Sequence, residues 1–235
     1  MTMKPIFYIM GKSASGKDTI YEELLADREL ALSPIIMYTT RPIRAKEKDG
    51  VDYHFTDEAG YQRLAQAGRV IEMREYQTVF GPWKYFTVDE SGIEETEEKG
   101  PADREGGDAG QRGAGGEAQP MAEDTVRETA GRGILGIGTL ESYKKIREYY
   151  GSGRVVPLYI EVDDGIRLER ALKRERKPGN QKYEEMCRRF LADQADFSEE
   201  RLLDAGIVRR YNNDRGLDDC VGEIRETVLG VYEGI

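Results

Sequence analysis

The chain has 235 residues and carries 45 acidic against 35 basic side chains, a formal net charge of -10 at pH 7. This charge disfavours broad affinity for nucleic acid, because phosphate backbones are bound by surplus Lys and Arg. The first apolar run, Ile6 to Met10, is far too short to span a membrane and does not lead into a signal-peptide cleavage site. We therefore expect a cytoplasmic protein with one α/β domain and insertions, and with no membrane or nucleic-acid partner.

A glycine-rich loop follows the strand predicted for Pro5 to Met10 and precedes a helical pattern that begins near Asp18. A strand, glycine loop and helix in this order turn successive backbone N–H groups inward as an anion nest, and Lys17 would reach the β and γ phosphates of a bound nucleotide. The alternative is a strand-helix turn that binds nothing. The residues expected to bind ATP are Gly11, Ser13, Ala14, Ser15, Gly16, Lys17, Asp18 and Thr19.

Asp18 stands where such loops usually place a Ser or Thr whose hydroxyl meets magnesium, and Thr19 follows it. A carboxylate suits a helix N-terminus, but it would repel phosphate unless a metal lies between them. Asp18 is therefore the candidate metal ligand.

A locally basic segment runs from Thr39 to Lys48, after a break at Ser33-Pro34 and a strand predicted for Ile35 to Tyr38. Arg41 and Arg44 are spaced three apart beside paired threonines, so they can converge on one phosphate group. The alternative is a solvated charged loop.

A helix is predicted to begin at Thr56-Asp57-Glu58 and to close at Gly68, with extended structure from Val70 to Tyr76. Within that strand Glu72 alternates with apolar neighbours, which by itself indicates an exposed face.

These features resemble the guanylate kinase family, because the phosphate loop, Thr39 to Arg44, Asp49 to Tyr53 and Val70 to Glu72 follow one another in that family's order. The resemblance implies that Arg41, Arg44 and Tyr53 hold the phosphate of an acceptor nucleotide. It also implies that Glu72 hydrogen-bonds the guanine edge and that Phe80 stacks in the acceptor site.

The chain departs from that family at three places. Met37 replaces an expected serine, and Phe80-Gly81-Pro82 replaces a tyrosine-glycine-threonine or serine step. Gly136 to Gly138 stands where the family has an aspartate-isoleucine-aspartate step. Glu141 or Asp18 are the candidates for the missing carboxylate near the metal.

Residues 94–133 have Glu-Glu and Gly-Gly runs and almost no aromatic or β-branched residues, which indicates a disordered insertion. A tolerated surface loop is the preferred interpretation and a partner-binding tail the alternative.

The C-terminal part alternates again between apolar strands and helices. Strands are predicted for Ile134 to Ile137, Val155 to Val162 and Ile207 to Tyr211. Helices are predicted to start at Thr139 and at Asp163-Asp164, and a closing helix has Asp218 near its start. Asn213 lies in a turn that resembles the family's turn beside the adenine.

Two basic helix ends joined at Pro178-Gly179-Asn180 resemble the mobile lid of nucleoside monophosphate kinases, and the alternative is a solvated hairpin. Arg174, Arg176 and Arg189 are the candidates for contact with the transferring phosphoryl group.

The cysteines and the histidine do not indicate a functional site. Cys187 and Cys220 lack a metal or redox spacing, so two reduced and mostly buried thiols and no zinc site are expected. His54, the only histidine, is expected to be a structural neighbour of Tyr53 and Phe55.

We therefore predict a P-loop three-layer α/β fold with a parallel central sheet. The kinase core comprises residues 1–32 and 134–235 with a lid at about 170–190, and residues 33–93 form an acceptor-binding subdomain. The resemblance implies Mg²⁺-dependent transfer of the γ-phosphoryl group of ATP to a nucleoside monophosphate, chiefly GMP. Alternatives are a kinase of this architecture with another small phosphorylated acceptor and a non-catalytic guanylate-kinase-like interaction module.

Overall fold

The computed structural model describes residues 4–78, 81–89, 131–179 and 181–234. Apart from its last three residues, the predicted insertion at 94–133 lies outside this range, and so does Phe80. None of the described helices is long and apolar enough to cross a membrane.

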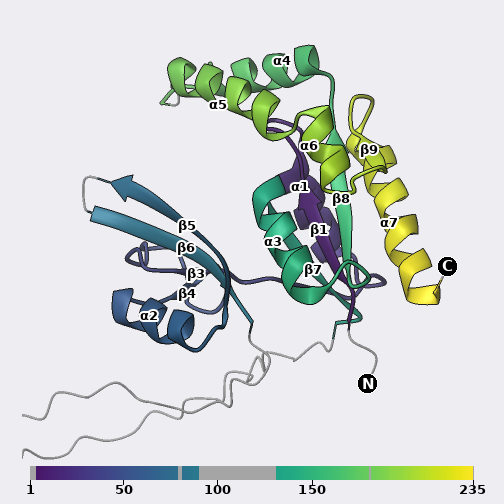
Figure 1. The fold of residues 1–235 in the computed structure, drawn as a ribbon. Helices are drawn as coiled ribbons and strands as arrows, with labels where there is room; N and C mark the ends of the chain where they lie inside the picture. Colours follow the sequence, from purple (N-terminus) through teal and green to yellow (C-terminus); the bar gives the residue numbers. More distant parts are fainter. Residues whose placement is uncertain (1–3, 79–80, 90–130, 180, 235) are drawn as a thin grey trace, which may run out of the picture. The chain divides into compact units, whose positions relative to one another are not determined.

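A parallel five-stranded sheet forms the core of the described fold, with strand order β2-β7-β1-β8-β9 (Figure 1). Its strands are β1 (Ile6–Met10), β2 (Leu32–Pro34), β7 (Gly133–Gly138), β8 (Val155–Glu161) and β9 (Arg210–Asn212). The phosphate loop follows β1, which lies in the middle of this sheet. The predicted parallel central sheet is confirmed.

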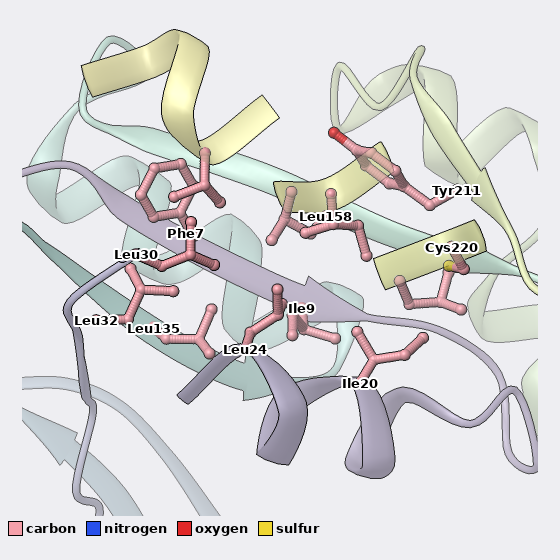
Figure 2. Packing of buried hydrophobic residues seen from close by; sticks show 13 residues of the cluster. Phe7, Ile9, Ile20, Leu24, Leu30, Leu32, Leu135, Leu158, Tyr211 and Cys220 are labelled. Carbon is pink, nitrogen blue, oxygen red and sulfur yellow. The ribbon is translucent and has the colours of Figure 1, made fainter. Parts of the chain in front are cut away.

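Both faces of this sheet are buried, which is why β1 is apolar at every position rather than at alternate ones. Phe7 and Ile9 pack into one hydrophobic cluster, whereas Ile6, Tyr8 and Met10 pack into a second one. Figure 2 shows the first cluster, in which Phe7 and Ile9 meet side chains of the flanking helices. Successive side chains of a strand point to opposite faces, so the two clusters lie on opposite sides of the sheet.

Helices cover both faces and complete the three predicted layers. The first cluster takes in α1 (Lys17–Ala26) and α7 (Leu217–Glu233), and the second takes in α3 (Leu140–Tyr150) and α6 (Glu199–Asp204). Thr139 caps α3 as predicted, in a capping box with Ser142. In α7, Ile224 and Val228 face inward.

A second sheet of four strands, in the order β4-β3-β6-β5, lies within residues 33–93, which were predicted as an acceptor-binding subdomain. It comprises β3 (Tyr38–Thr39), β4 (His54–Phe55), β5 (Val70–Thr78) and β6 (Gly81–Val88), with α2 (Glu58–Gln66) beside it (Figure 1). Asp57 caps α2 and Gly68 ends it with a φ of 67°, as predicted. The ring of His54 stacks on Tyr38 with centroids 4.5 Å apart, which fits its expected structural role.

The basic hairpin predicted as the lid consists of α4 (Asp164–Glu175) and α5 (Tyr183–Asp196). Asp163 caps α4 by accepting hydrogen bonds from the backbone N–H groups of Gly165 and Ile166. The helices are separated at Pro178-Gly179, where Gly179 has a φ of 87°. The predicted helix start and helix break are both confirmed.

Three expectations were wrong in detail. The strand predicted for Ile35 to Tyr38 is instead two strands on either side, β2 and β3. Pro34 is tolerated in β2 because that strand is at the sheet edge, where one row of backbone N–H groups has no ladder partner. The last strand begins at Arg210 rather than Ile207, although Ile207 is buried. Cys187 is exposed, because its position on α5 does not face a core, and Cys220 is buried as expected.

Candidate active site

The phosphate loop joins the end of β1 to the start of α1 and has the backbone that its glycines predict. Gly16 has a φ of 87° and Ala14 a φ of 62°, so two loop residues adopt the left-handed conformation. A side chain on Gly11 would bring its Cβ within 2.7 Å of the carbonyl oxygen of Ile160. No side chain caps α1 at Gly16, so the first N–H groups of this helix remain open to an anion.

A buried arginine fastens the loop to the hairpin. The side chain of Arg167 on α4 is 1% exposed, and its Nε donates a hydrogen bond to the carbonyl oxygen of Ser13 at 2.9 Å. Its two terminal nitrogens bind carboxylates, Asp164 at 2.5 Å and Asp193 at 2.7 Å. Asp193, which lies on α5, also accepts the backbone N–H of Ser13 at 2.8 Å. Arg167 and Asp193 together therefore fix the outer rim of the loop.

Lys12 and Gln194 extend this arrangement, which we call the loop anchor: Lys12, Ser13, Asp164, Arg167, Asp193 and Gln194. Lys12 donates to the side-chain oxygen of Gln194 at 2.8 Å and lies 3.5 Å from Asp164. Burial would raise the pKa of Asp164, but hydrogen bonds from Gln194 and Arg167 outweigh it and lower that pKa. Asp164 therefore stays ionised at neutral pH and keeps its two cationic partners.

The predicted ATP-binding residues around Lys17 lie together. Lys17 Nζ is 3.6 Å from the Asp18 carboxylate, whose side chain is 81% exposed. Asn213 directly follows β9. It donates its side-chain N–H to the carbonyl oxygen of Ser15 at 2.8 Å and so supports the loop. The buried hydroxyl of Ser15 has no hydrogen-bond partner among the described residues. An orphaned hydroxyl inside an anion nest fits a site that a ligand completes.

The predicted phosphate-binding arginines occupy different environments. The side chain of Arg41 is 3% exposed, and its fork is bidentate on Glu47 with N···O distances of 2.6 and 2.7 Å. Its Nε donates to the hydroxyl of Tyr85 at 3.1 Å, and its guanidinium lies over the ring of Tyr53. Arg44 is exposed, and its backbone N–H donates to the same Glu47 carboxylate. The structure thus directs the fork of Arg41 to Glu47 and leaves the side chain of Arg44 at the surface.

Glu72 is buried, so the interpretation of its position as a solvent-exposed strand face is wrong. The pairing of β5 with β6 shifts register between Val70 and Glu72, which opposes Glu72 to Thr87. Thr87 donates its hydroxyl to Oε1 of Glu72 at 2.9 Å. Arg74, two residues along the same face of β5, lies with its Nε 3.3 Å from Oε2. Neither Thr87 nor Arg74 was singled out from the sequence.

Two cavities meet at Arg74. The first has a volume of about 450 Å³ and is lined by Met37, Tyr53, Arg74, Tyr76, Trp83, Tyr85 and Arg189. The second has a volume of about 320 Å³ and is lined by Val70, Ile71, Glu72, Met73, Arg74, Glu141, Ser142 and Lys145. Predicted acceptor residues thus line both cavities.

Of the three predicted lid arginines, only Arg189 lines the first cavity. Its Nε donates to Glu185 at 2.7 Å on the same helix. Arg174 lies 3.3 Å from Glu175, and Arg176 ends α4 at an exposed position. The hairpin therefore brings Arg189 to residues predicted to bind the acceptor, and Arg189 already has a carboxylate partner.

Tyr8 explains why β7 carries glycines where acidic residues were expected. A Cβ on Gly136 would lie 2.6 Å from the ring of Tyr8, and a Cβ on Gly138 would overlap its hydroxyl. That hydroxyl donates to Ser142 at 2.9 Å, and burial raises the pKa of Tyr8 to about 12. A neutral tyrosine thus fills the space that side chains at these two positions would need.

The described residues do not form a cluster of carboxylates for a metal. Within the described ranges, no group of three or more His, Cys, Asp or Glu side chains is arranged to hold an ion. Asp18 and Glu141 are both exposed.

Part of the chain is similar to known proteins. The guanylate kinase family model matches residues 2–100. A guanylate kinase of Novosphingobium aromaticivorans is 42% identical over 77 residues, which cover 32% of this chain and 33% of the relative. A guanylate kinase of Aliivibrio fischeri is 34% identical over 101 residues, covering 43% and 46%. The matched segments thus span between a third and a half of these relatives.

The whole described fold is similar to a solved structure. The crystal structure of guanylate kinase from Anaplasma phagocytophilum matches with a TM-score of 0.51 and 19% identity, over 99% of this chain and 89% of that one. At this identity the likeness concerns the fold, and it confirms the predicted P-loop α/β architecture.

Proposed function

We propose that this protein, whose residues 2–100 match the guanylate kinase family model, transfers the γ-phosphoryl group of ATP to GMP. The observation that carries the proposal is the phosphate loop itself. Its backbone N–H groups and the uncapped start of α1 form an anion site, with Lys17 beside it. Phosphoryl transfer relies on positioning and charge stabilisation rather than on a protein base, which suits a chain with one histidine.

The donor side is held by residues with distinct tasks. Lys17 neutralises the charge on the β and γ phosphates, and Asn213 and Arg167 hold the loop around them through the carbonyl oxygens of Ser15 and Ser13. Asp18 places a carboxylate beside Lys17, which fits Mg²⁺ bound mainly by phosphate oxygens and water. Mg²⁺ would supply charge neutralisation there.

The acceptor side combines a phosphate end and a base end. Arg44 and the hydroxyl of Tyr53 bind the phosphate of GMP, while Arg41 keeps the segment in place through Glu47. The buried Glu72 accepts the N1–H and exocyclic amine of guanine, an edge that adenine does not offer.

Closure of α4 and α5 completes the site. Arg189 already lines the acceptor cavity, so a small movement away from Glu185 brings its guanidinium to the transferring phosphoryl group. Closure also excludes water and so limits hydrolysis of ATP.

A coupled assay of ADP release with GMP, dGMP, AMP, CMP and UMP tests the proposal. Rapid release with GMP and dGMP, far above the rate with ATP alone, is the expected result. Turnover restricted to another acceptor would contradict GMP as substrate and favour a different phosphorylated acceptor. No turnover with any acceptor, together with no ATP binding by calorimetry, would favour the interaction module.

A further inference from the structure

Arg74 has a position that the proposed function does not use. It lies on β5 two residues after Glu72, so the two side chains share one face of the strand. Arg74 Nη2 is 3.4 Å from Glu72 Oε1 and 3.5 Å from the sulfur of Met37. Arg74 is also the residue that lines both the 450 Å³ and the 320 Å³ cavity.

The pair of Arg74 and Glu72 is loose compared with the pair of Arg41 and Glu47, which lies in the segment between β3 and β4. Arg41 and Glu47 meet through two bonds of 2.6 and 2.7 Å, the geometry of a saturated fork. Arg74 approaches Glu72 only to 3.3 and 3.4 Å. Its Nε is buried and makes no hydrogen bond within the described residues. A guanidinium has five donors and no acceptor, so most donors of Arg74 remain available to a ligand.

A carboxylate and a guanidinium side by side present acceptors next to donors. Guanine has the matching order: its N1–H and amino group are donors, and the adjacent O6 and N7 are acceptors that suit an arginine fork. Adenine has the reverse order, so its N1 acceptor would face Glu72 and its amino group would face Arg74. The pair therefore selects a purine that carries an oxygen at position 6.

We propose that Arg74 is a second base-reading residue, which donates to O6 and N7 of the acceptor base while Glu72 accepts from N1–H and the amino group. This role rests on the proposed function, because it assigns Arg74 to the acceptor nucleotide of the same reaction. Met37 lies just before β3, and its sulfur is a weak acceptor and not a donor, so it cannot supply these hydrogen bonds.

The competing explanation is that Arg74 only compensates the buried charge of Glu72. Such a role would affect every acceptor that uses Glu72, whatever stands at position 6 of the base. Three nucleotides separate the two explanations: GMP, inosine 5′-monophosphate, which keeps O6, N7 and N1–H, and 6-thioguanosine 5′-monophosphate, which keeps N1–H, the amino group and N7 but has a weakly accepting sulfur in place of O6.

Arg74→Met removes the fork and keeps an unbranched side chain. We expect kcat/KM for GMP and for inosine monophosphate to fall between about 5-fold and 150-fold, the range for one bidentate base contact. The 6-thioguanine nucleotide should lose no more than about threefold, because its sulfur offers the fork only a weak acceptor. Arg74→Lys keeps the charge near Glu72 but not the fork. Its losses of kcat/KM should therefore rank the three nucleotides in the same order as those of Arg74→Met, but each loss should be smaller. Arg63→Met removes an exposed arginine of the same subdomain and is the matched control, with parental values expected.

The outcomes separate the two proposals. Turnover of GMP by the parent protein with equal losses for the three nucleotides in Arg74→Met would overturn the base-reading role alone. Absence of GMP turnover by the parent protein would overturn the proposed function and this role with it. Melting curves of each variant identify one that fails to fold, and Arg74→Lys then carries the test.

Discussion

The loop anchor and the acceptor cavities hold their charged groups in opposite ways. In the loop anchor, all three nitrogens of Arg167 donate to protein oxygens at 2.5 to 2.9 Å. At the acceptor cavities, Arg74 and Glu72 approach only to 3.3 and 3.4 Å, and one nitrogen of Arg74 has no hydrogen bond within the described residues. The protein itself therefore preorganises the loop anchor, whereas the cavities at Arg74 leave groups for a ligand to complete.

This difference has an energetic consequence. A buried charge with every hydrogen-bond partner present rigidifies the structure. Removing it leaves its charged partners uncompensated in a medium of low dielectric constant, which is strongly destabilising. A loosely paired group costs less to disturb, and ligand binding can recover its unused hydrogen bonds. Substitutions in the loop anchor should therefore act on stability, and those at the cavities chiefly on substrate use.

Arg167→Met should have the largest effect on stability. It leaves Asp193 and Asp164 without their buried cation, so the free energy of unfolding should fall by about 3–5 kcal/mol. Arg188→Met is the matched control, because Arg188 is 67% exposed and pairs on the surface with Glu185, and it should change stability by less than about 1 kcal/mol. Urea unfolding of both variants measures this difference. Equal losses of unfolding free energy in the two variants would contradict a stabilising role of the loop anchor.

Lys17→Ala should have the largest effect on turnover with little change in fold. Its side chain lies at the partly open loop, 22% exposed, with Nζ 3.6 Å from the exposed Asp18 carboxylate. Loss of one preorganised charge at such a site lowers kcat by about 100-fold to 1,000-fold. Lys144→Ala removes a surface lysine that pairs with Asp204 and serves as the control. Parental kcat in Lys17→Ala would remove the phosphate-loop assignment.

The parts of the fold that the sequence predicts are those set by local physics. The caps at Asp57, Thr139 and Asp163 each bond to backbone within three residues, so a short window of sequence contains the whole signal. The phosphate loop is equally local, since Gly11 and Gly16 fix its geometry. These elements are confirmed.

The parts that were missed depend on contacts between distant segments. Arg167 bonds to Ser13, 154 residues away, and no periodicity of the helix distinguishes it from its solvated basic neighbours. The burial of Glu72 follows from a register shift and from Thr87 on the next strand. One signal was present in the sequence, because glycines inside a strand, as at Gly136 and Gly138, often mark the close approach of another group.

Gly138→Asp tests that close approach and should have a moderate effect. Its Cβ would overlap the Tyr8 hydroxyl and lie 2.6 Å from the Ser142 hydroxyl, so stability should fall by about 1–3 kcal/mol through overpacking. In a Tyr8→Ala background the same substitution should cost less, since space is then available. Gly153→Asp, which meets no atom within 4 Å, is the control. Additive losses in the double variant would show that Tyr8 does not exclude the carboxylate.

Glu47→Gln should have the smallest effect, and one that depends on pH. Hydrogen bonds from Arg41 lower the pKa of Glu47 to about 2 from an ordinary value of 4.5. Because the folded pKa is depressed, the unfolded chain binds the proton first as the pH falls. The stabilisation is therefore complete above about pH 4.5 and is lost progressively toward pH 2.

The amide of the variant cannot titrate, so the two proteins should converge in acid. We expect Glu47→Gln to melt below the parent protein at pH 7, and the gap in melting temperature to shrink steadily between pH 5 and pH 3. Glu22→Gln, at an exposed position on α1, should show no such change. A gap that stays constant over this range would mean that the pair of Arg41 and Glu47 does not stabilise the acceptor segment through charge. The fork of Arg41 would then be free to bind phosphate, and the contrast between a saturated Arg41 and an available Arg74 would fail.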